Sequence, residues 1–217
     1  MGDDERPTAE IVRARLAALR ARLGDVEIVA VTKGFGPWAL ESAVAAGCDA
    51  IGENYAQELL AKREVIERLA PEVHFIGQLQ SNKVRQIAGL VDVWETVDRM
   101  SLVDELAKRA PGARLLVQVD TTGQAGKGGC APEGVADLVS AARAAGLVPL
   151  GLMAVGPTGA PPDAARGGFR IVRSLVDSLG LEVCSMGMSA DADVAVEEGS
   201  TQIRVGTALF GPRPPRT

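Results

Sequence analysis

The sequence predicts one α/β domain folded as a closed (β/α)8 barrel. Strand-like apolar runs alternate with helix-length amphipathic segments, about eight such units can be counted, and no linker-like stretch divides the 217 residues. A doubly wound open sheet would show the same alternation. The number of repeats fits a barrel better, because barrels begin at roughly 200 residues and the loops here are short. We therefore expect a single barrel domain over residues 1–217.

An extra helix is expected before the first strand, at about residues 8–24. Apolar residues recur there at helical spacing among arginines, Thr8 can cap the helix, and Gly24 can end it. The next run, residues 27–32 (EIVAVT), is nearly all apolar. That composition is typical of a parallel strand that is covered on both faces.

The rest of the chain continues the alternation. Strands are expected at residues 49–52, 73–76, 91–94, 114–119, 150–155, 182–186 and 202–205. Helices are expected at residues 37–46, 56–70, 81–89, 101–110, 132–145, 163–179 and 191–198. The Gly/Pro-dense stretch 156–168 is expected to be a loop, and residues 212–217 a flexible tail.

Composition excludes several classes of protein. Lys and Arg number 23 against 28 Asp and Glu, a net charge of −5, and aromatics make up 3%, which argues against nucleic-acid binding. No apolar run approaches the roughly 18 residues of a membrane helix, and the acidic N-terminus is unlike a secretory signal. Three cysteines without a CxxC pair suit a reducing compartment. We expect a cytoplasmic protein, in which a local basic pocket for one phosphate group remains possible.

The ends of the expected strands carry the candidate reactive groups, because barrel active sites form at the C-terminal ends of the strands. Lys33 ends the first apolar strand. A lysine desolvated there can act as an amine nucleophile toward a carbonyl. Alternatively, its side chain extends from the strand end into water, which is common for lysine. Position alone does not separate these two interpretations.

The loops after the last two strands indicate a phosphate site. Residues 185–189 (SMGMS) and 204–207 (RVGT) follow these strands, where barrels commonly bind phosphate. Ser189 and Thr207 offer hydroxyl donors, and Gly206 allows close approach of an anion to the backbone. Tight turns would explain each segment separately but not their occurrence together, so we favour phosphate binding.

Three other features are interpreted as structural. His74 is the only histidine and lies in an apolar strand, so neither a Ser-His-Asp triad nor a multi-histidine metal site is expected. The glycine-rich run 123–129 lacks the first glycine of a Walker A motif, since Thr121 occupies that position, and we expect a mobile loop. The charge run 62–68 is expected to be a solvated helix face with i,i+4 pairs.

Six segments in register resemble the pyridoxal-phosphate homeostasis protein family, also called YggS/PROSC-like proteins. They are VAVTK (29–33), GENY (52–55), HFIGQLQSNK (74–83), GLMA (151–154), MGMSxD (186–191) and GSTxxRxGT (199–207). The resemblance covers about residues 28–211. It implies the barrel of fold-type III pyridoxal-phosphate proteins, shared with the N-terminal domain of alanine racemase, and it implies pyridoxal 5'-phosphate as the cofactor.

The resemblance also implies the cofactor-binding residues: Lys33 through a Schiff base (the internal aldimine), Ser189, Gly206 and Thr207 at the phosphate, Arg204 facing the pyridine nitrogen, Asn54 beside the cofactor, and Met153 near the ring. An arginine donor leaves the pyridine nitrogen unprotonated, so the ring is a weak electron sink. Alanine racemases use a tyrosine from an additional C-terminal domain as second base, whereas this chain ends soon after Thr207 and its single tyrosine is Tyr55. We expect no catalytic residues and no metal site.

The expected function is therefore a monomeric pyridoxal-phosphate carrier that supplies the cofactor to apo-enzymes without robust turnover. The alternatives are an amino-acid racemase with a minimal active site and a sugar-phosphate aldolase that uses Lys33. The loop after the fifth strand departs from the family pattern, because Asp120 and Gln124 precede Lys127 where relatives carry Asn and Glu. That difference bears on loop-mediated release rather than on Lys33.

Overall fold

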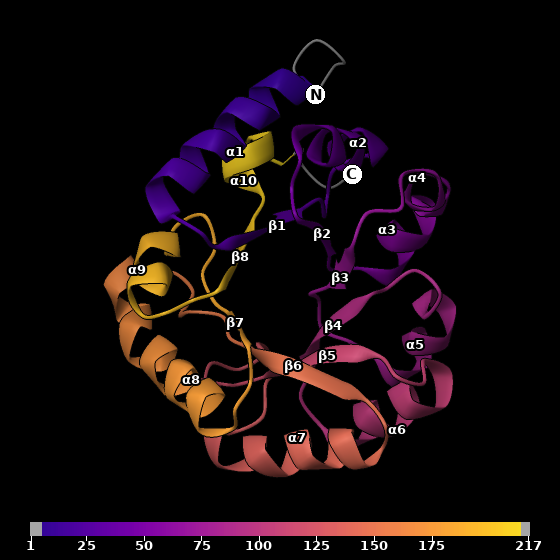
Figure 1. The fold of residues 1–217 in the computed structure, drawn as a ribbon, viewed down its shortest axis with the longest axis vertical. Helices are drawn as coiled ribbons and strands as arrows, with labels where there is room; N and C mark the ends of the chain where they lie inside the picture. The colour runs from indigo at the N-terminus through magenta and orange to yellow at the C-terminus, as the bar shows by residue number, and fades with distance from the viewer. Residues whose placement is uncertain (1–5, 214–217) are drawn as a thin grey trace.

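The computed structural model describes residues 6–213 and shows a closed barrel of parallel strands in sequential order (Figure 1). The strands are β1 (Glu27–Val31), β2 (Ala50–Glu53), β3 (Val73–Phe75), β4 (Val93–Val97), β5 (Arg114–Gln118), β6 (Val148–Met153), β7 (Val183–Ser185) and β8 (Gln202–Val205). β8 pairs with β1 over residues 27–30, which closes the ring. The predicted barrel is confirmed.

Helices surround the barrel, as Figure 1 shows. They are α1 (Ala9–Leu23), α2 (Pro37–Ala46), α3 (Ala56–Ala61), α4 (Arg63–Leu69), α5 (Ser81–Ile87), α6 (Met100–Arg109), α7 (Val135–Ala144), α8 (Arg166–Ser178), α9 (Ala192–Glu197) and α10 (Thr207–Phe210). Short 3₁₀ turns, η2 (Pro132–Gly134) and η3 (Pro162–Ala165), precede α7 and α8. Within residues 6–213, no helix has both the length and the apolar character needed to cross a membrane.

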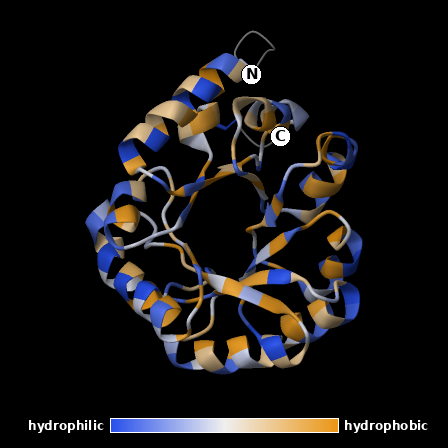
Figure 2. Ribbon diagram, in the orientation of Figure 1, coloured by the Kyte–Doolittle hydropathy of each residue, from blue (hydrophilic) through white to orange (hydrophobic). Residues whose placement is uncertain are grey.

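Two apolar clusters form the core, one on each side of the barrel wall. On β5, Leu115 and Val117 belong to the large cluster between strands and helices, whereas Leu116 belongs to a small cluster with Val93 and Met153. Alternate residues of a strand point to opposite faces, so this division separates the outer from the inner face of the barrel. Figure 2 shows hydrophobic residues along the strands and hydrophilic ones mainly on the outward helix faces.

The extra N-terminal helix is present as predicted. Thr8 Oγ1 accepts a hydrogen bond from the backbone N–H of Ile11 at 3.4 Å, as an N-cap does. The buried residues of α1 recur at helical spacing, Val12, Leu16, Leu19 and Leu23. They face α2 and α10, so α1 covers the side of the barrel where β8 meets β1 (Figure 1).

The helix expected over residues 56–70 is two helices, α3 and α4, that meet at Lys62. Lys62 is 3% exposed, and its ammonium donates to the Thr32 carbonyl at 2.8 Å and to Glu53. The prediction of a solvated helix face is therefore wrong for Lys62, which turns inward because a buried carboxylate lies beneath it. The i,i+4 pair between Arg63 and Glu67 is confirmed at 3.2 Å.

Helix α10 was not expected from the sequence, and it follows β8 directly. Of the expected tail at 212–217, residues 214–217 lie outside the described residues. Arg213 is described, and it lies beside the pocket presented next.

Candidate functional site

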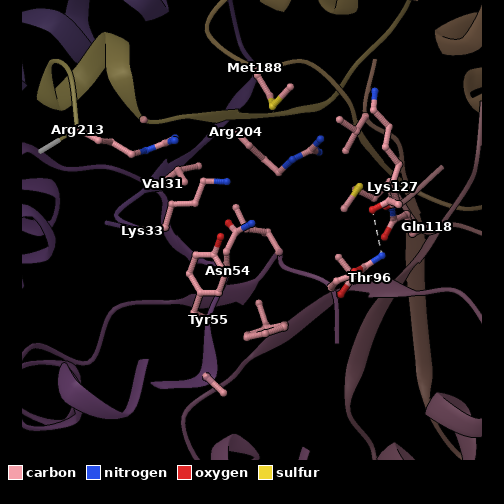
Figure 3. A pocket seen from close by; sticks show the side chains of 18 of the residues that line it. Val31, Lys33, Asn54, Tyr55, Thr96, Gln118, Lys127, Met188, Arg204 and Arg213 are labelled. Carbon is pink, nitrogen blue, oxygen red and sulfur yellow. Dashed lines mark hydrogen bonds between the residues drawn. The ribbon is translucent and has the colours of Figure 1, made fainter. Parts of the chain in front are cut away.

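A pocket of about 720 Å³ opens at the C-terminal ends of the strands. All seven site residues expected from the sequence line it: Lys33, Asn54, Met153, Ser189, Arg204, Gly206 and Thr207. Figure 3 labels Lys33, Asn54 and Arg204 among them. Gln78, from the HFIGQLQSNK segment, lines it as well, whereas Glu53 of the GENY segment and Asp120 do not. The structure thus brings together residues that lie up to 174 positions apart, from Lys33 to Thr207 (207 − 33).

The pocket is cationic although the chain as a whole is acidic. Among residues 6–213, those that line the pocket include no Asp or Glu, and the basic ones are Lys33, Lys83, Lys127, Arg204 and Arg213. The net charge of the full chain is −5. A concave surface lined by one sign of charge concentrates ligands of the opposite sign. The pocket is therefore suited to an anion.

Lys33 lies directly after β1, on a backbone that is held from behind. The Thr32 hydroxyl donates to Glu53 Oε1 at 2.6 Å, and the Thr32 carbonyl accepts from Lys62. The half-buried Lys33 amine has no hydrogen bond or ion pair with any described residue. Partial burial, together with the charges of Arg213 and Arg204, lowers the pKa of Lys33. A larger share of this amine is then neutral and nucleophilic.

Glu53 and Lys62 form a buried ion pair behind Lys33. Glu53 is fully buried, and burial raises its pKa while Lys62 acts in the opposite direction. Glu53 Oε2 lacks a hydrogen-bond partner in the described part of the chain. This pair does not line the pocket, so its role is to hold the end of β1 against β2.

Arg204 is fixed at the base of the pocket by contacts with β7 and with the end of β6. Its Nη1 donates to the Ser185 carbonyl at 2.9 Å and to Ser185 Oγ at 2.5 Å, and its Nη2 donates to the Ala154 carbonyl at 2.8 Å. Three of the five N–H groups that a guanidinium carries are thereby used. The remaining two, on Nε and Nη2, have no acceptor among residues 6–213.

Below Arg204, the fully buried Glu95 is the centre of a polar network. Its Oε2 accepts from Ser185 Oγ at 2.8 Å, and its Oε1 accepts from Gln202 Nε2 at 2.6 Å and lies 2.6 Å from His74 Nδ1. Burial opposes ionisation of Glu95, but its hydrogen bond and ion pair with His74, the charge of Arg204 and the Ser185 hydrogen bond lower its pKa. Glu95 is therefore a carboxylate that supports Arg204 through Ser185.

His74 is a packed strand residue, as expected, and neighbouring carboxylates favour its charged form. Burial alone would lower its pKa, but the carboxylates of Glu72 and Glu95, with a smaller contribution from Glu27, raise the pKa to about 9. His74 Nε2 lies 3.6 Å from Glu72 Oε1, beyond hydrogen-bond distance, so that contact is an ion pair. Glu72 stands two positions before His74, but Glu95 comes from another strand, so the sequence alone did not indicate this buried ion pair.

The expected phosphate residues lie on two loops whose backbone is tightly constrained. A Cβ at Gly206 would lie 3.1 Å from the Val31 carbonyl oxygen, and one at Gly187, where φ is +90°, would lie 2.6 Å from Ala195 Cβ. Asp191 Oδ1 accepts from the Met188 N–H at 2.7 Å and holds the loop that carries Ser189. The Ser189 and Thr207 hydroxyls are exposed and have no hydrogen-bond partner among the described residues.

Asn54 and Met153 occupy other sides of the pocket. Asn54 Oδ1 is buried without a hydrogen-bond partner among the described residues. A buried amide oxygen without a donor is unfavourable, so the site is suited to a ligand that supplies one. Met153, at the end of β6, is 1% exposed and belongs to the small inner cluster.

Several lining residues were not expected from the sequence, among them Lys83, Gln118, Lys127 and Arg213. Lys127 comes from the glycine-rich run, where its ammonium donates to the Gly156 carbonyl and its own carbonyl accepts from Gln118 Nε2 at 2.9 Å (Figure 3). Asp120 instead accepts from the N–H groups of Thr122 and Gly123 within its own loop. Lys83 stands in the HFIGQLQSNK segment, which was the one available signal for it.

Comparison with known proteins gives a consistent result. Residues 9–214 match the family model described as alanine racemase, N-terminal domain. A pyridoxal phosphate homeostasis protein of Pseudomonas aeruginosa is 40% identical over 195 residues, covering 87% of this chain and 85% of that protein. One of Aquifex aeolicus is 36% identical over 222 residues, covering 96% and 97%.

Solved structures agree. The structure of PipY from Synechococcus elongatus with PLP bound has a TM-score of 0.84 at 32% identity, covering 92% of this chain and 100% of that one. The structure of SrLDC in complex with PLP and cadaverine has a TM-score of 0.76 at 19% identity, covering 94% of this chain and 60% of that one. The latter likeness concerns the fold alone.

Proposed function

The chain belongs to the pyridoxal phosphate homeostasis protein family and carries the alanine racemase N-terminal domain, and from this premise we propose that it binds pyridoxal 5'-phosphate in the pocket. Its role is in homeostasis of that cofactor. One observation carries the proposal: an unpaired, half-buried lysine amine stands in a pocket whose charged lining, within the described residues, is entirely basic. The PLP-bound PipY structure supports the same ligand.

The residues present fit this cofactor, which is an anionic phosphate ester with an aldehyde and a pyridine nitrogen. The Lys33 amine is free to react, and the two free N–H groups of Arg204 can donate to a ring nitrogen. Gly206 lines the pocket without a side chain, beside Thr207, whose hydroxyl is a further donor. The orphaned oxygen of Asn54 can accept a hydrogen bond from the ligand.

When bound, pyridoxal phosphate supplies an aldehyde carbon that condenses reversibly with a primary amine. In this proposal Lys33 provides that amine, and Ser189, Gly206 and Thr207 bind the phosphate. Arg204 donates to the pyridine nitrogen, while Asn54 and Met153 lie beside the ring. Because a guanidinium is a donor and not an acceptor at neutral pH, Arg204 holds the nitrogen unprotonated.

We propose that the protein holds the cofactor and delivers it to apo-enzymes in the cytoplasm as a monomer, without robust turnover. Ser185 and Glu95 support this by keeping Arg204 charged and in place, which leaves the ring a weak electron sink.

Amino-acid racemisation is the second candidate, because Tyr55 lines the same pocket as Lys33 and could exchange a proton. Chiral analysis of amino acids incubated with the loaded protein separates the two, since only a racemase changes the enantiomer ratio.

The test of the binding site is a Lys33→Ala variant. We expect the wild-type protein to acquire visible absorption with pyridoxal phosphate, and borohydride reduction to fix the cofactor on the peptide that contains Lys33. Lys33→Ala should lose both signals while unfolding like the wild type, because the side chain makes no hydrogen bond within the described residues.

A Lys108→Ala variant is the control, since Lys108 is an exposed lysine of α6 that does not line the pocket. A wild-type protein that ignores the cofactor would overturn the proposed function. Reduction that labels Lys33→Ala as strongly as the wild type would overturn the assignment of the site.

A further inference from the structure

We propose that Arg213 binds the phosphate group of the ligand and makes the pocket select phosphorylated over unphosphorylated vitamin B6 aldehydes. This inference rests on the proposed function and adds a residue that the sequence motifs do not include. Three observations support it: the position of Arg213, the absence of a hydrogen bond or ion pair between Arg213 and any described residue, and the two glycines between which its side chain lies.

Arg213 follows α10 and spans the gap between the loops after β1 and β8. Its Cδ lies 3.3 Å from the point where a Cβ would stand on Gly34, and its Nη2 lies 3.7 Å from the equivalent point on Gly206. Figure 3 shows the side chain extending toward Lys33 at the edge of the pocket. The guanidinium is therefore placed beside the backbone expected to bind phosphate.

The two flanking glycines leave the space that this arginine occupies. Gly34 has a φ of +74°, a conformation that residues with a side chain rarely adopt, and its N–H donates to Glu58 Oε2 at 2.7 Å. A Cβ at Gly34 would lie in tight contact with the stem of Arg213, and a Cβ at Gly206 would lie in tight contact with the Val31 carbonyl oxygen. The position of Arg213 thus follows from the fold of both loops.

Arg213 differs from most arginines within residues 6–213 because its charge has no partner among those residues. Most arginines within residues 6–213 donate to a carbonyl or carboxylate oxygen, as Arg15 does to Leu209 and Arg166 to Glu198. Arg213 makes no hydrogen bond or ion pair with a described residue. It lies instead near another cation, since its charge helps to lower the pKa of Lys33.

A phosphate monoester supplies what this arrangement lacks. It carries a charge of about −1.5 to −2 at neutral pH, whereas Ser189, Gly206 and Thr207 offer only neutral donors. A guanidinium matches phosphate with two parallel N–H···O hydrogen bonds, which are stronger than those from neutral donors. Arg213 then provides the positive charge that balances the phosphate, and the phosphate in turn offsets the repulsion between Arg213 and Lys33.

The experiment compares pyridoxal phosphate with pyridoxal, which has the same aldehyde and ring but no phosphate. Affinities are measured by absorbance titration of the wild type, Arg213→Gln, Arg213→Lys and the control Arg143→Gln. Arg143 is an exposed arginine of α7 that does not line the pocket, so the control matches the change in charge. Thermal unfolding without ligand shows that each variant is folded.

We expect Arg213→Gln to weaken pyridoxal phosphate binding about tenfold while pyridoxal binding changes less than twofold. Arg213→Lys should lose less, because it keeps the charge without the paired donors. An Arg213→Gln variant that weakens both ligands equally, or neither, overturns the inference while leaving the proposed function intact. A wild type that binds neither ligand overturns the proposed function itself.

Discussion

Charged side chains are arranged differently in the interior of the barrel and at its mouth, the pocket at the C-terminal ends of the strands. In the interior, the fully buried Glu95 carboxylate lies between two basic side chains. His74 Nδ1 is 2.6 Å from Glu95 Oε1, and Arg204 Nη1 is 3.8 Å from Glu95 Oε2, with the Ser185 hydroxyl hydrogen-bonded to both. At the mouth, Lys33, Lys83, Lys127 and Arg213 line a pocket without a single carboxylate among residues 6–213.

The difference separates charges that are paired within the fold from charges whose grouping favours an anion. A buried ion needs a partner, since removing one side of a buried pair commonly costs about 3–5 kcal/mol. An exposed or half-exposed cation has no such need, and grouping several of them raises the local concentration of anions. Arg204 belongs to both regions, because its anchored N–H groups face the interior network and its free ones are left for the pocket.

The largest expected effect comes from breaking the interior network at Glu95. Glu95→Gln keeps the shape but leaves His74 and Arg204 without their shared carboxylate, and it should lower the free energy of unfolding at pH 7 by about 3 kcal/mol. Urea unfolding without cofactor measures it. Glu64→Gln, on the exposed surface of α4, is the control and should change the free energy by about 0.5 kcal/mol or less. Equal effects of the two substitutions would contradict the distinction between interior and mouth.

The second prediction concerns pH and the same network. The pKa of His74 is raised to about 9, above its unfolded value of 6.5, by Glu72, Glu95 and Glu27. The stabilisation from protonated His74 is then fully present below pH 6.5 and is lost as the pH rises through 9. This loss amounts to about 3 kcal/mol, from 1.36 kcal/mol per pKa unit.

Urea unfolding at a series of pH values checks this prediction. His74→Gln should remove most of the fall in stability between pH 6.5 and 9 that the wild type shows. A wild-type stability that is flat over this window would mean that His74 is neutral in the folded protein.

The smallest effect on stability is expected at the mouth. Lys83 has no ion pair within the described residues, so Lys83→Gln should change the free energy of unfolding by about 0.5 kcal/mol or less. Its effect should instead be on binding: pyridoxal phosphate affinity should fall a few-fold at low salt and less at high salt, because salt screens exposed charges. A loss of more than about 1 kcal/mol of stability would place Lys83 among the structural charges.

Local pattern was sufficient to predict the barrel and part of the lining of its pocket. Strand β8 and helix α2 occur at the residues expected, because periodicity and flanking glycines act over a few residues. Parallel strands in sequential order bring all their C-terminal ends to one side, so Lys33, Ser189 and Thr207 could be assigned to one site from the sequence alone. Their roles toward the cofactor remain proposals.

The supporting charges could not be predicted in the same way. In the sequence, Lys62 is one member of a charge run that is expected to be solvated. Its side chain points inward because its ammonium donates to Glu53 and to the Thr32 carbonyl, which lie beneath it. Arg213 belongs to a stretch expected to be a flexible tail, and its place depends on two glycines in distant loops.

By itself, the sequence determined the order of strands and helices, the lysine at the end of the first strand and the two loops suited to phosphate, since each is encoded in a few neighbouring residues. Only the tertiary structure decided which charges are paired. Ser185 and Gln202 reach Glu95 from 90 and 107 positions away, and contacts of that separation leave no periodic trace in a single chain. Electrostatic energy depends on distance and burial in space, and those quantities exist only once the barrel has closed.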